Sequence, residues 1–511
     1  MRHLFPLFLI FSCLLTFLPG CEPKEDLVQT SGSLEFSTDS VKFDTVFTTI
    51  TTVTKRLWVY NRNAGAVRVE RIGLANQTGA EPYQLIVNGD AGNAASNVLI
   101  RGKDSLQVLV KAVLGGNNIN KPFLLTDQLN FRTNGHDQHV QLVAFGQNAY
   151  FHNGETLPCN SVWRNDKPHV IYNSILVNTG CTLRIMPGTR VYSHAGSGII
   201  VKGRILVNAG TDFVPGTSDT DTIKATNSNI VRFLGDRREP FYNNIPGQWL
   251  GIQLQPGSVG NIIRYAEIRN ASFGVLLYNP ENRSPQPNVT LDNTVIQNIS
   301  GNNLSFGGGG NNFAGGGILS YSGTVTATNC LFTNCGEYAV LGVGGGIYNF
   351  NFCTFANYTP AFRRETSSLT FTNEKATDGS KQPLTLNLLN SIVWGSFEDE
   401  LFLKNNADYF ATVKINNTLL RTKEYQATTD ATGKPGLAAA TLANLVNVDP
   451  VFVSTPLTSS RSDYRLQATS PATSPRRSAA SGSTVPPRDL LNLPRPNHNR
   501  TMPSLGAYEH Q

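Results

Sequence analysis

Charged residues are scarce in this sequence. Only 15% of its 511 residues are Asp, Glu, Lys or Arg, whereas soluble globular proteins typically have roughly 25%. A helical bundle or coiled coil needs Ala, Glu, Lys and Leu repeated at helical period, so this composition argues against both. The formal net charge of +6 is diffuse, and nucleic-acid binding is therefore not expected.

The sequence also lacks the spacings that metal and cofactor sites require. It has seven cysteines but no C-x-x-C pair, and its histidines do not cluster near the cysteines, so neither a metal site nor a cofactor is expected. The glycine-rich run 307–317 lacks the Lys-Ser/Thr of a phosphate-binding loop and the Asp of calcium-binding repeats. This run is instead expected to be a loop that leaves one repeat.

Residues 1–20 have the features of a secretory signal. A short basic region precedes an apolar stretch at residues 4–17, which is too short to span a bilayer comfortably. The stretch ends in Leu18-Pro19-Gly20-Cys21. This resembles the lipobox of bacterial lipoproteins, in which the Cys becomes the lipidated mature N-terminus. No later stretch approaches 18 apolar residues, so no transmembrane helix is expected after it.

Residues 21–31 are expected to form a tether. The segment begins Cys21-Glu-Pro-Lys-Glu-Asp26, and a charged start that contains Pro suits a link between a lipid and a folded domain. An acidic run after a lipidated Cys also resembles the surface-export signal of Bacteroidetes lipoproteins. The resemblance implies an outer-membrane protein that is held by its N-terminal lipid and exposed at the cell surface. The alternative is a plain signal peptide with Cys21 there by coincidence.

Residues 32–150 alternate β-branched and aromatic runs with turn signals such as Asn88-Gly89-Asp90 and Asn134-Gly135. About seven short strands in roughly 110 residues are typical of an immunoglobulin-like β-sandwich. No Cys…Trp…Cys pattern is present, so this is not a true immunoglobulin domain. It resembles the Ig-like modules that bacterial secreted proteins place before a larger domain, and its expected role is a spacer or stalk.

From about residue 151 the pattern becomes that of a repeat. Short apolar strands separated by Gly predict parallel strands stacked in coils. A unit of an apolar residue, any residue and Asn then recurs at 268–270, 296–298, 332–334 and 355–357. In a parallel β-helix the apolar residue points inside. The Asn lies at a turn, where it tolerates left-handed backbone angles and can hydrogen-bond along the ladder.

These segments resemble the right-handed parallel β-helix lipoproteins of Bacteroidetes over residues 162–357. The C-terminus, which ends in Leu505-Gly-Ala-Tyr-Glu509, resembles the tail that closes many bacterial β-helix proteins, with Leu505 where an Ile is common. The resemblance implies an all-β chain, with an Ig-like β-sandwich at 32–150. A right-handed parallel β-helix solenoid with a C-terminal cap follows at 151–511. The basic, Pro- and Ser-rich segment 476–500 is expected to wrap the last coil as extended chain.

Five cysteines remain beyond the signal and Cys21, so they cannot all pair within the chain. We predict a disulfide between Cys159 and Cys181, which would link the start of the second domain to its first turn. The other three are expected to be small buried residues: Cys330, Cys335 and Cys353.

A catalytic site is hard to find in the sequence. A glycoside hydrolase needs two carboxylates that face one another across a cleft, but the sequence has no Asp-Asp pair and no Gly-His-Gly. Its most charged local run is Asp236-Arg237-Arg238-Glu239. Asp236, Arg237 and Glu239 form either a catalytic or sugar-binding loop, or an ordinary surface loop with local pairing. Trp163 and Trp249 could stack on sugars, but their apolar context favours core packing.

The sequence therefore leaves two classes of function open. The first is a non-catalytic structural, adhesive or glycan-binding protein whose partner is a polysaccharide or another cell-surface ligand. The second is a polysaccharide lyase or glycoside hydrolase that acts on an extracellular polysaccharide. A carrier or assembly role at the cell envelope is not distinguished from adhesion by any residue pattern.

Overall fold

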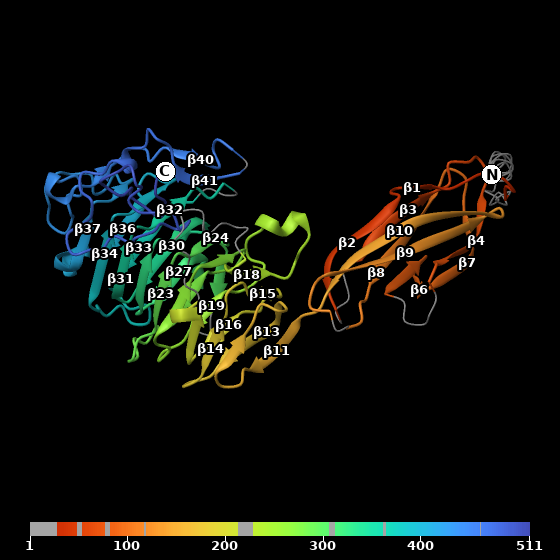
Figure 1. Ribbon diagram of the computed structural model, residues 1–511, viewed down its shortest axis with the longest axis horizontal. Helices are drawn as coiled ribbons and strands as arrows, with labels where there is room; N and C mark the ends of the chain where they lie inside the picture. Colours follow the sequence, from red (N-terminus) through yellow and green to blue (C-terminus); the bar gives the residue numbers. More distant parts are fainter. Residues whose placement is uncertain are drawn as a thin grey trace, which may run out of the picture. The chain divides into compact units, whose positions relative to one another are not determined.

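The computed structural model describes residues 28–48, 54–76, 82–116, 119–212, 228–305, 312–360, 364–459 and 461–511. The expected all-β class is confirmed, because these residues form β-strands with only short 3-10 helices, labelled η (Figure 1). The chain divides into two compact units between Gln147 and Asn148. Cys21 lies outside the described residues. Among those described, no helix is both long enough and apolar enough to cross a membrane.

The first unit consists of two five-stranded sheets. The strands of one are β1 (Glu35–Phe36), β3 (Lys55–Tyr60), β8 (Ser105–Ala112), β5 (Tyr83–Val87) and β6 (Asp90–Gly92), in spatial order. Those of the other are β2 (Ser40–Phe47), β10 (His136–Gln147), β9 (Phe123–Thr133), β4 (Val67–Leu74) and β7 (Ala94–Ile100). Neighbours are antiparallel except β2 and β10, which are parallel. The described residues of the first unit therefore form ten strands, whereas the sequence indicated about seven.

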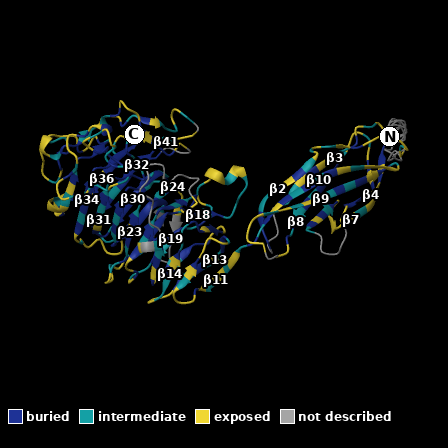
Figure 2. Ribbon diagram, viewed as in Figure 1, coloured by how far each residue is buried: buried dark blue, intermediate teal, exposed yellow. Residues whose placement is uncertain are grey.

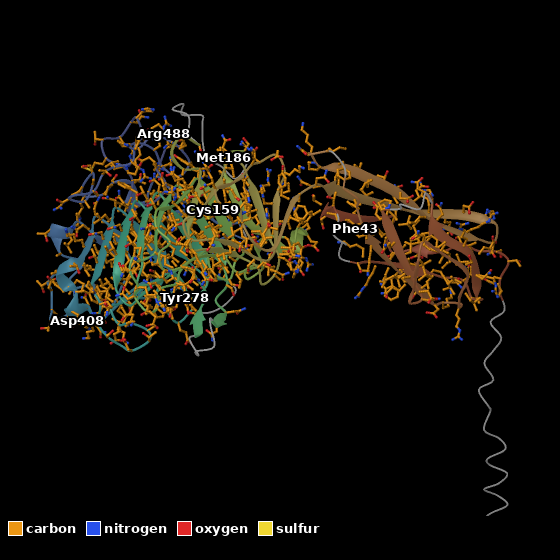
Figure 3. All side chains as sticks on the ribbon, turned by 90° about the horizontal axis from the view of Figure 1, so that it is seen from below. Phe43, Cys159, Met186, Tyr278, Asp408 and Arg488 are labelled. Atoms are coloured by element: carbon orange, nitrogen blue, oxygen red, sulfur yellow. A yellow bond between two sulfur atoms is a disulfide. The ribbon has the colours of Figure 1, made fainter. Side chains whose placement is uncertain are left out.

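Alternating side chains from both sheets of the first unit meet in one apolar core. In β8 every second residue is buried, as expected for a strand with one face on a core and one toward water. Phe43 of β2, Val108 of β8 and Phe131 of β9 all belong to this core, and Phe43 is labelled in Figure 3. The core thus holds the two sheets face to face.

The second unit is built on two parallel sheets, one of eighteen strands and one of nine, as expected for stacked coils and consistent with a β-helix. Along the chain, each full coil adds one strand to the nine-stranded sheet and then two to the eighteen-stranded sheet. The nine strands are β12 (Ser161–Trp163), β14 (Thr182–Ile185), β17 (Arg204–Val207), β20 (Asn261–Arg264), β23 (Asn288–Asp292), β28 (Thr324–Thr328), β31 (Gly346–Asn351), β34 (Leu384–Leu389) and β37 (Val413–Asn416).

The eighteen-stranded sheet contains two rows of strands. The first row is β11 (Tyr150–Thr156), β13 (His169–Val177), β15 (Arg190–Ser193), β18 (Val231–Gly235), β21 (Ala266–Arg269), β24 (Val295–Ile299), β29 (Leu331–Cys335), β32 (Thr354–Asn357), β35 (Ile392–Gly395), β38 (Leu419–Leu420) and β39 (Leu445–Val446). The second is β16 (Ile199–Val201), β19 (Ile252–Leu254), β22 (Val275–Leu277), β27 (Gly316–Tyr321), β30 (Tyr338–Val343), β33 (Leu369–Thr372) and β36 (Leu401–Lys404).

The apolar residues of the repeated sequence unit stack in register inside the second unit. Ile268 pairs with Ile296, Ile296 with Phe332, and Phe332 with Phe355. All four are fully buried. The longest spacing of the repeat contains the antiparallel pair β25 (Asn303–Ser305) and β26 (Asn312–Ala314), so an insertion accounts for it. Part of the glycine-rich run, residues 307–311, lies outside the described residues.

Three of the four asparagines of the unit have the left-handed backbone angles that were predicted for them. The predicted turn position holds for Asn270, which directly follows β21, whereas Asn298 and Asn334 lie within β24 and β29. Asn270, Asn298 and Asn334 have φ angles of 60°, 55° and 50°, in the left-handed region that Asn tolerates. Asn334 Nδ2 donates to Asn298 Oδ1 over 2.9 Å, so the expected ladder also forms there. Asn357 is the exception, because its amide bonds the peptide groups of Cys335 instead.

The interior of the second unit is one continuous apolar cluster that begins at Leu157 and ends at Leu437 (Figure 2). Cys330, Cys335 and Cys353 are free and buried within it, as the sequence predicted. Cys159 and Cys181 are joined by a disulfide, with their Cα atoms 4.6 Å apart.

The chain after β39, residues 447–511, is called the C-terminal segment. It does not wrap the last coil alone but lies along the flank of several coils (Figure 1). It includes β40 (Phe452–Ser454) and β41 (Asp463–Leu466). Backbone or side-chain groups of its residues 477–489 bond five asparagines of successive coils, in order back along the stack: Asn417, Asn390, Asn351, Asn329 and Asn293. Arg488 of this segment and Tyr278, just beyond β22, lie on opposite sides of the unit (Figure 3).

Candidate functional site

The outward side of the first strand row changes character along the stack. One register row runs through Arg190, Arg232, Glu267, Val295, Leu331, Thr354, Ile392 and Leu419. Leu331, Ile392 and Leu419 pack against apolar residues of the C-terminal segment such as Phe452 and Leu505. The earlier positions of the same row are charged. We call the outward side of β13, β15, β18 and β21 the open face.

Three polar side chains lie together at one edge of the open face. One register row contains Ile171, Ser193 and Gly235. The residues that directly follow these three along the chain are Tyr172, His194 and Asp236. His194 Nδ1 lies 2.7 Å from Asp236 Oδ2, and Tyr172 donates its hydroxyl to the same oxygen over 3.4 Å. The Tyr172 and His194 rings are stacked, with centroids 4.6 Å apart. The imidazole is about half exposed, whereas the carboxylate is largely covered.

Of the three residues predicted from the sequence, Arg237 and Glu239 contact each other, whereas Asp236 contacts different residues. Arg237 and Glu239 form a forked ion pair, with Nη2 to Oε1 at 2.9 Å and Nε to Oε2 at 3.1 Å. The Arg237 guanidinium also stands over the ring of Tyr242, 3.9 Å from its centroid. Asp236 is paired with His194 and Tyr172, two residues that local sequence reasoning missed. The coil register alone brings them together, across 42 and 64 positions of sequence.

The loop that follows β18 carries a second guanidinium on an aromatic ring. Arg238 Nη1 donates to the Tyr192 hydroxyl over 2.9 Å, and its guanidinium stands 4.8 Å from the ring centroid. The loop continues into η2 (Pro240–Asn244), which is drawn mostly as exposed in Figure 2. Its Phe241 is 74% exposed. Because Gln248 donates to two carbonyls of this loop, the aromatic side chain is held on an anchored turn.

The charged row of the open face contains a single carboxylate, that of Glu267. The Glu267 carboxylate forms ion pairs with Arg232 at 3.3 Å and with Arg269 at 3.3 Å. It also accepts a hydrogen bond from Gln297 over 2.6 Å. Arg190 is exposed, and its side chain has no hydrogen bond or ion pair with another described residue.

Burial, followed by the charge of Asp236, raises the pKa of Tyr172 to about 12. The phenol is therefore protonated at neutral pH and acts as a hydrogen-bond donor. This arrangement suits the recognition of a polar ligand better than the removal of a proton from it.

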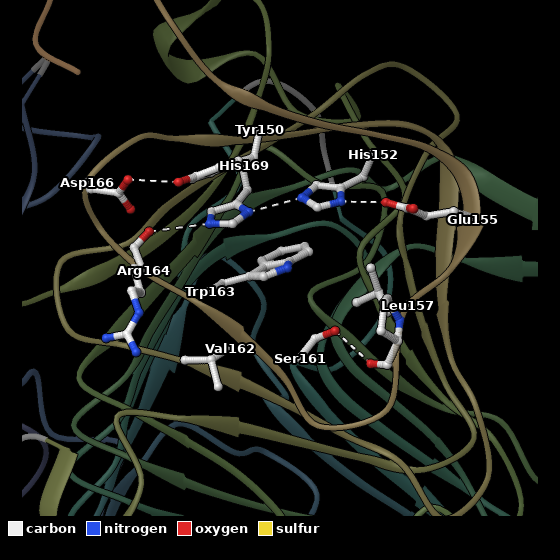
Figure 4. Close-up of a pocket in the computed structure, with 11 residues that line it drawn as sticks. Tyr150, His152, Glu155, Leu157, Ser161, Val162, Trp163, Arg164, Asp166 and His169 are labelled. Carbon is white, nitrogen blue, oxygen red and sulfur yellow. Dashed lines mark hydrogen bonds and ion pairs between the residues drawn. The ribbon is translucent and has the colours of Figure 1, made fainter. Parts of the chain in front are cut away.

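A pocket of about 430 Å³ lies at the start of the second unit (Figure 4). Its lining includes Tyr150, Trp163 and Asp166, together with two histidines that are hydrogen-bonded to each other, His152 and His169. His152 Nδ1 is 2.6 Å from Glu155 Oε1, and its Nε2 is 3.0 Å from His169 Nδ1. Trp163 stacks on both imidazoles, at 4.6 and 4.3 Å.

The histidines of this pocket are neutral at ordinary pH. Burial lowers the pKa of His152 and lowers that of His169 to about 3, with the neighbouring imidazole acting in the same direction. Trp163 and Trp249 are both buried, in agreement with the packing role that their sequence context favoured. The ring stack therefore closes the start of the apolar interior, and the pocket is a weaker candidate than the open face.

In the part of the chain that the structure describes, no group of three or more His, Cys, Asp or Glu side chains could hold a metal ion. Comparison of the sequence with protein-family models and with curated proteins gives no match.

Proposed function

We propose that the chain is a lipid-anchored outer-membrane protein, exposed at the cell surface, that binds a glycan on the open face without cleaving it. In this proposal the first unit is an Ig-like β-sandwich that serves as a spacer. The second is a right-handed parallel β-helix of the kind that Bacteroidetes lipoproteins contain. The two facing sheets of the first unit and the coiled parallel sheets of the second support this assignment.

The observation that carries the proposal is the change along one register row. The row is apolar where it packs against the C-terminal segment and charged at its earlier positions. Beside it lie aromatic rings and hydrogen-bonding groups, including Tyr172, His194 and Asp236. Parallel strands hold such groups at a spacing of about 4.8 Å. A rigid row of donors, acceptors and rings suits an extended polymer of sugar units, which offers hydroxyls and apolar faces.

The pairing of the carboxylates favours binding over hydrolysis. Hydrolysis requires two carboxyl groups that act on opposite sides of one glycosidic bond. Here Asp236 is bonded to His194 and Tyr172, and Glu239 is held by both nitrogens of the Arg237 fork.

A glycan array probed with the chain lacking residues 1–20 tests the proposal. We expect one or more glycans to bind, and we expect Tyr172→Ala combined with Asp236→Asn to weaken that binding at least tenfold, or about 1.4 kcal/mol. Arg204→Gln, an exposed substitution on β17 of the other sheet, is the control and should bind normally. Absence of any bound glycan would overturn the proposal.

The alternative is a polysaccharide lyase, favoured by the stacking of His194 on Tyr172 beside several guanidinia. Imidazole is a common general base, but the raised pKa of Tyr172 opposes a role for that phenol as the base. Incubation with acidic polysaccharides, followed by the ultraviolet absorbance of unsaturated products, tests this alternative. Turnover that His194→Ala abolishes would replace the binding function with an enzymatic one.

The anchoring part of the proposal has its own experiment. The full chain should partition with the membrane fraction and incorporate a labelled fatty acid, whereas Cys21→Ser should do neither. Digestion of intact cells with a protease then tests surface exposure, because an inward-facing protein would survive it. A Cys21→Ser variant that stays membrane-bound would contradict lipid anchoring through this residue.

A further inference from the structure

Two arginines occupy directly paired positions on neighbouring strands of the open face. Arg190 of β15 pairs with Arg232 of β18. The next residues, Val191 and Phe233, are fully buried, so the two arginine side chains point outward. Paired residues on adjacent strands lie about 4.8 Å apart in the hydrogen-bonding direction. Like charges in such positions repel each other.

The surroundings do not neutralise this pair. Glu267 is shared by Arg232 and Arg269. Together with Arg190, three arginines on this part of the open face stand against one glutamate, which leaves 3 − 1 = +2. The remaining cation, Arg190, has no bonded partner among the described side chains.

The neighbouring groups on the loop do not remove the excess. Arg237 is balanced by Glu239. Asp236 is hydrogen-bonded to His194, and Arg238 to a neutral phenol, that of Tyr192. With His counted as neutral, the charges of Asp236, Arg237, Arg238 and Glu239 sum to zero, so the loop leaves the excess unchanged. Tyr192 lies two residues after Arg190 on the outward side of the same strand. Two guanidinia, those of Arg190 and Arg238, are thus available at the same strand.

We propose that the open face binds an acidic polysaccharide, with Arg190 and Arg238 contacting oxyanion groups that its sugar units carry. The inference rests on the proposed glycan-binding function and specifies its ligand class. A guanidinium presents a planar fork of donors that matches a carboxylate or a sulfate ester. Such a group between Arg190 and Arg232 would also replace their mutual repulsion with attraction.

The experiment measures binding of the chain lacking residues 1–20 to three polymers in native affinity gels. Polygalacturonate carries carboxylates, dextran sulfate carries sulfate esters, and dextran is neutral. We expect one or both polyanions to slow the protein and dextran to leave it unaffected. The polymer that is bound then identifies the oxyanion. Added salt should weaken the interaction, because the contacts are ionic and largely exposed.

Matched variants locate the site. Arg190→Gln should weaken polyanion binding at least tenfold, whereas Arg204→Gln, which removes an exposed arginine from β17 of the nine-stranded sheet, should leave it unchanged. Glu267→Gln removes the carboxylate that competes for Arg232, so it should strengthen binding. Circular dichroism of each variant checks that the fold is retained.

The outcomes separate this inference from the proposed function. Binding of a neutral glycan that depends on Tyr172 and not on Arg190 would overturn the acidic ligand and keep the glycan-binding function. An equal loss in Arg190→Gln and Arg204→Gln would also overturn it, because diffuse positive charge would then explain the binding. If no glycan of any kind binds, the proposed function itself fails.

Discussion

At the scale of single residues, His169 makes the stability of the second unit depend on pH. Burial lowers its pKa to about 3, against about 6.5 for an unfolded chain. Between these values the unfolded state binds more protons, so the stability present above about pH 6.5 falls as the pH falls toward 3. One extra proton changes the free energy of unfolding by about 1.4 kcal/mol per pH unit. The lowered pKa of His152 acts in the same direction.

His169→Gln should therefore make the second unit less sensitive to acid. We expect the variant to show a smaller loss of unfolding free energy than the unsubstituted chain between about pH 6.5 and pH 4, as measured by urea denaturation. His136→Gln, at an exposed position of β10 in the first unit, is the control and should leave that loss unchanged. Equal acid sensitivity of His169→Gln and the unsubstituted chain would refute the assignment.

A second residue-scale prediction concerns the buried pair of Arg364 and Glu400. Both side chains are fully buried, with Nη2 to Oε1 at 2.6 Å, and the carboxylate also accepts the amide of Phe397 over 2.9 Å. Removing one partner leaves a buried charge uncompensated, which costs about 3–5 kcal/mol. Arg364→Met should therefore lower the free energy of unfolding by that amount in chemical denaturation.

The exposed pair of Lys423 and Glu398 provides the comparison for Arg364→Met. Its side chains are 71% and 69% exposed, and such pairs contribute about 0–1 kcal/mol. Lys423→Met should accordingly have little effect. Losses of similar size in the two variants would show that burial does not control the strength of the Arg364 pair.

The sequence predicted the residues of the repeat better than those of the site. The left-handed backbone of an Asn is a local property, so Asn270 and Asn334 could be assigned from spacing alone. Tyr172 and His194 could not be assigned to Asp236, because they lie in other coils and the coils differ in length. Asp236 lies 42 positions after His194 and 64 positions after Tyr172, so the two intervening coils are of unequal length. One sequence alone gives no means to align coils of such different lengths.

At the scale of elements, the C-terminal segment should depend on the asparagine ladder that it contacts. Asn390 accepts the amide of Ala480 over 2.7 Å, donates to Ser483 over 2.9 Å and has a φ angle of 52°. Asn390→Ala removes these buried hydrogen bonds, each contributing about 1 kcal/mol. We expect faster amide hydrogen exchange in residues 477–489, measured by mass spectrometry.

The control for the ladder is Asn298→Ala. Asn298 also has a left-handed φ, of 55°, but its amide bonds Asn244 and Asn334 rather than the C-terminal segment. The backbone strain of Ala is therefore similar in both variants. Exchange in residues 477–489 that rises equally in both would show that general destabilisation, and not the lost contacts, releases the segment.

The path of the C-terminal segment was beyond sequence reasoning for a physical reason. The coil asparagines bond mainly its backbone carbonyls, such as those of Thr484 and Arg488, and every residue carries a carbonyl. The apolar anchors, including Leu490 and Leu505, are widely spaced and follow no helical or strand period. In contrast, the stacked strands were predicted correctly because their buried residues recur with a fixed pattern.

At the scale of the whole molecule, the two units have separate apolar cores. The core of the first includes Phe131, and that of the second includes Phe355, with no residue common to both. Units with their own cores can unfold separately. We therefore expect two thermal transitions in calorimetry of the chain lacking residues 1–20.

Single core substitutions assign each transition to its unit. Phe131 and Phe355 are both fully buried, and truncation of either to Ala costs about 3–5 kcal/mol. Phe131→Ala should lower the midpoint of one transition only, and Phe355→Ala should lower that of the other only. Each variant thus serves as the control for the other. A single transition that both variants shift to the same extent would mean that the two cores unfold as one cooperative structure, and the first unit would then be more than a spacer.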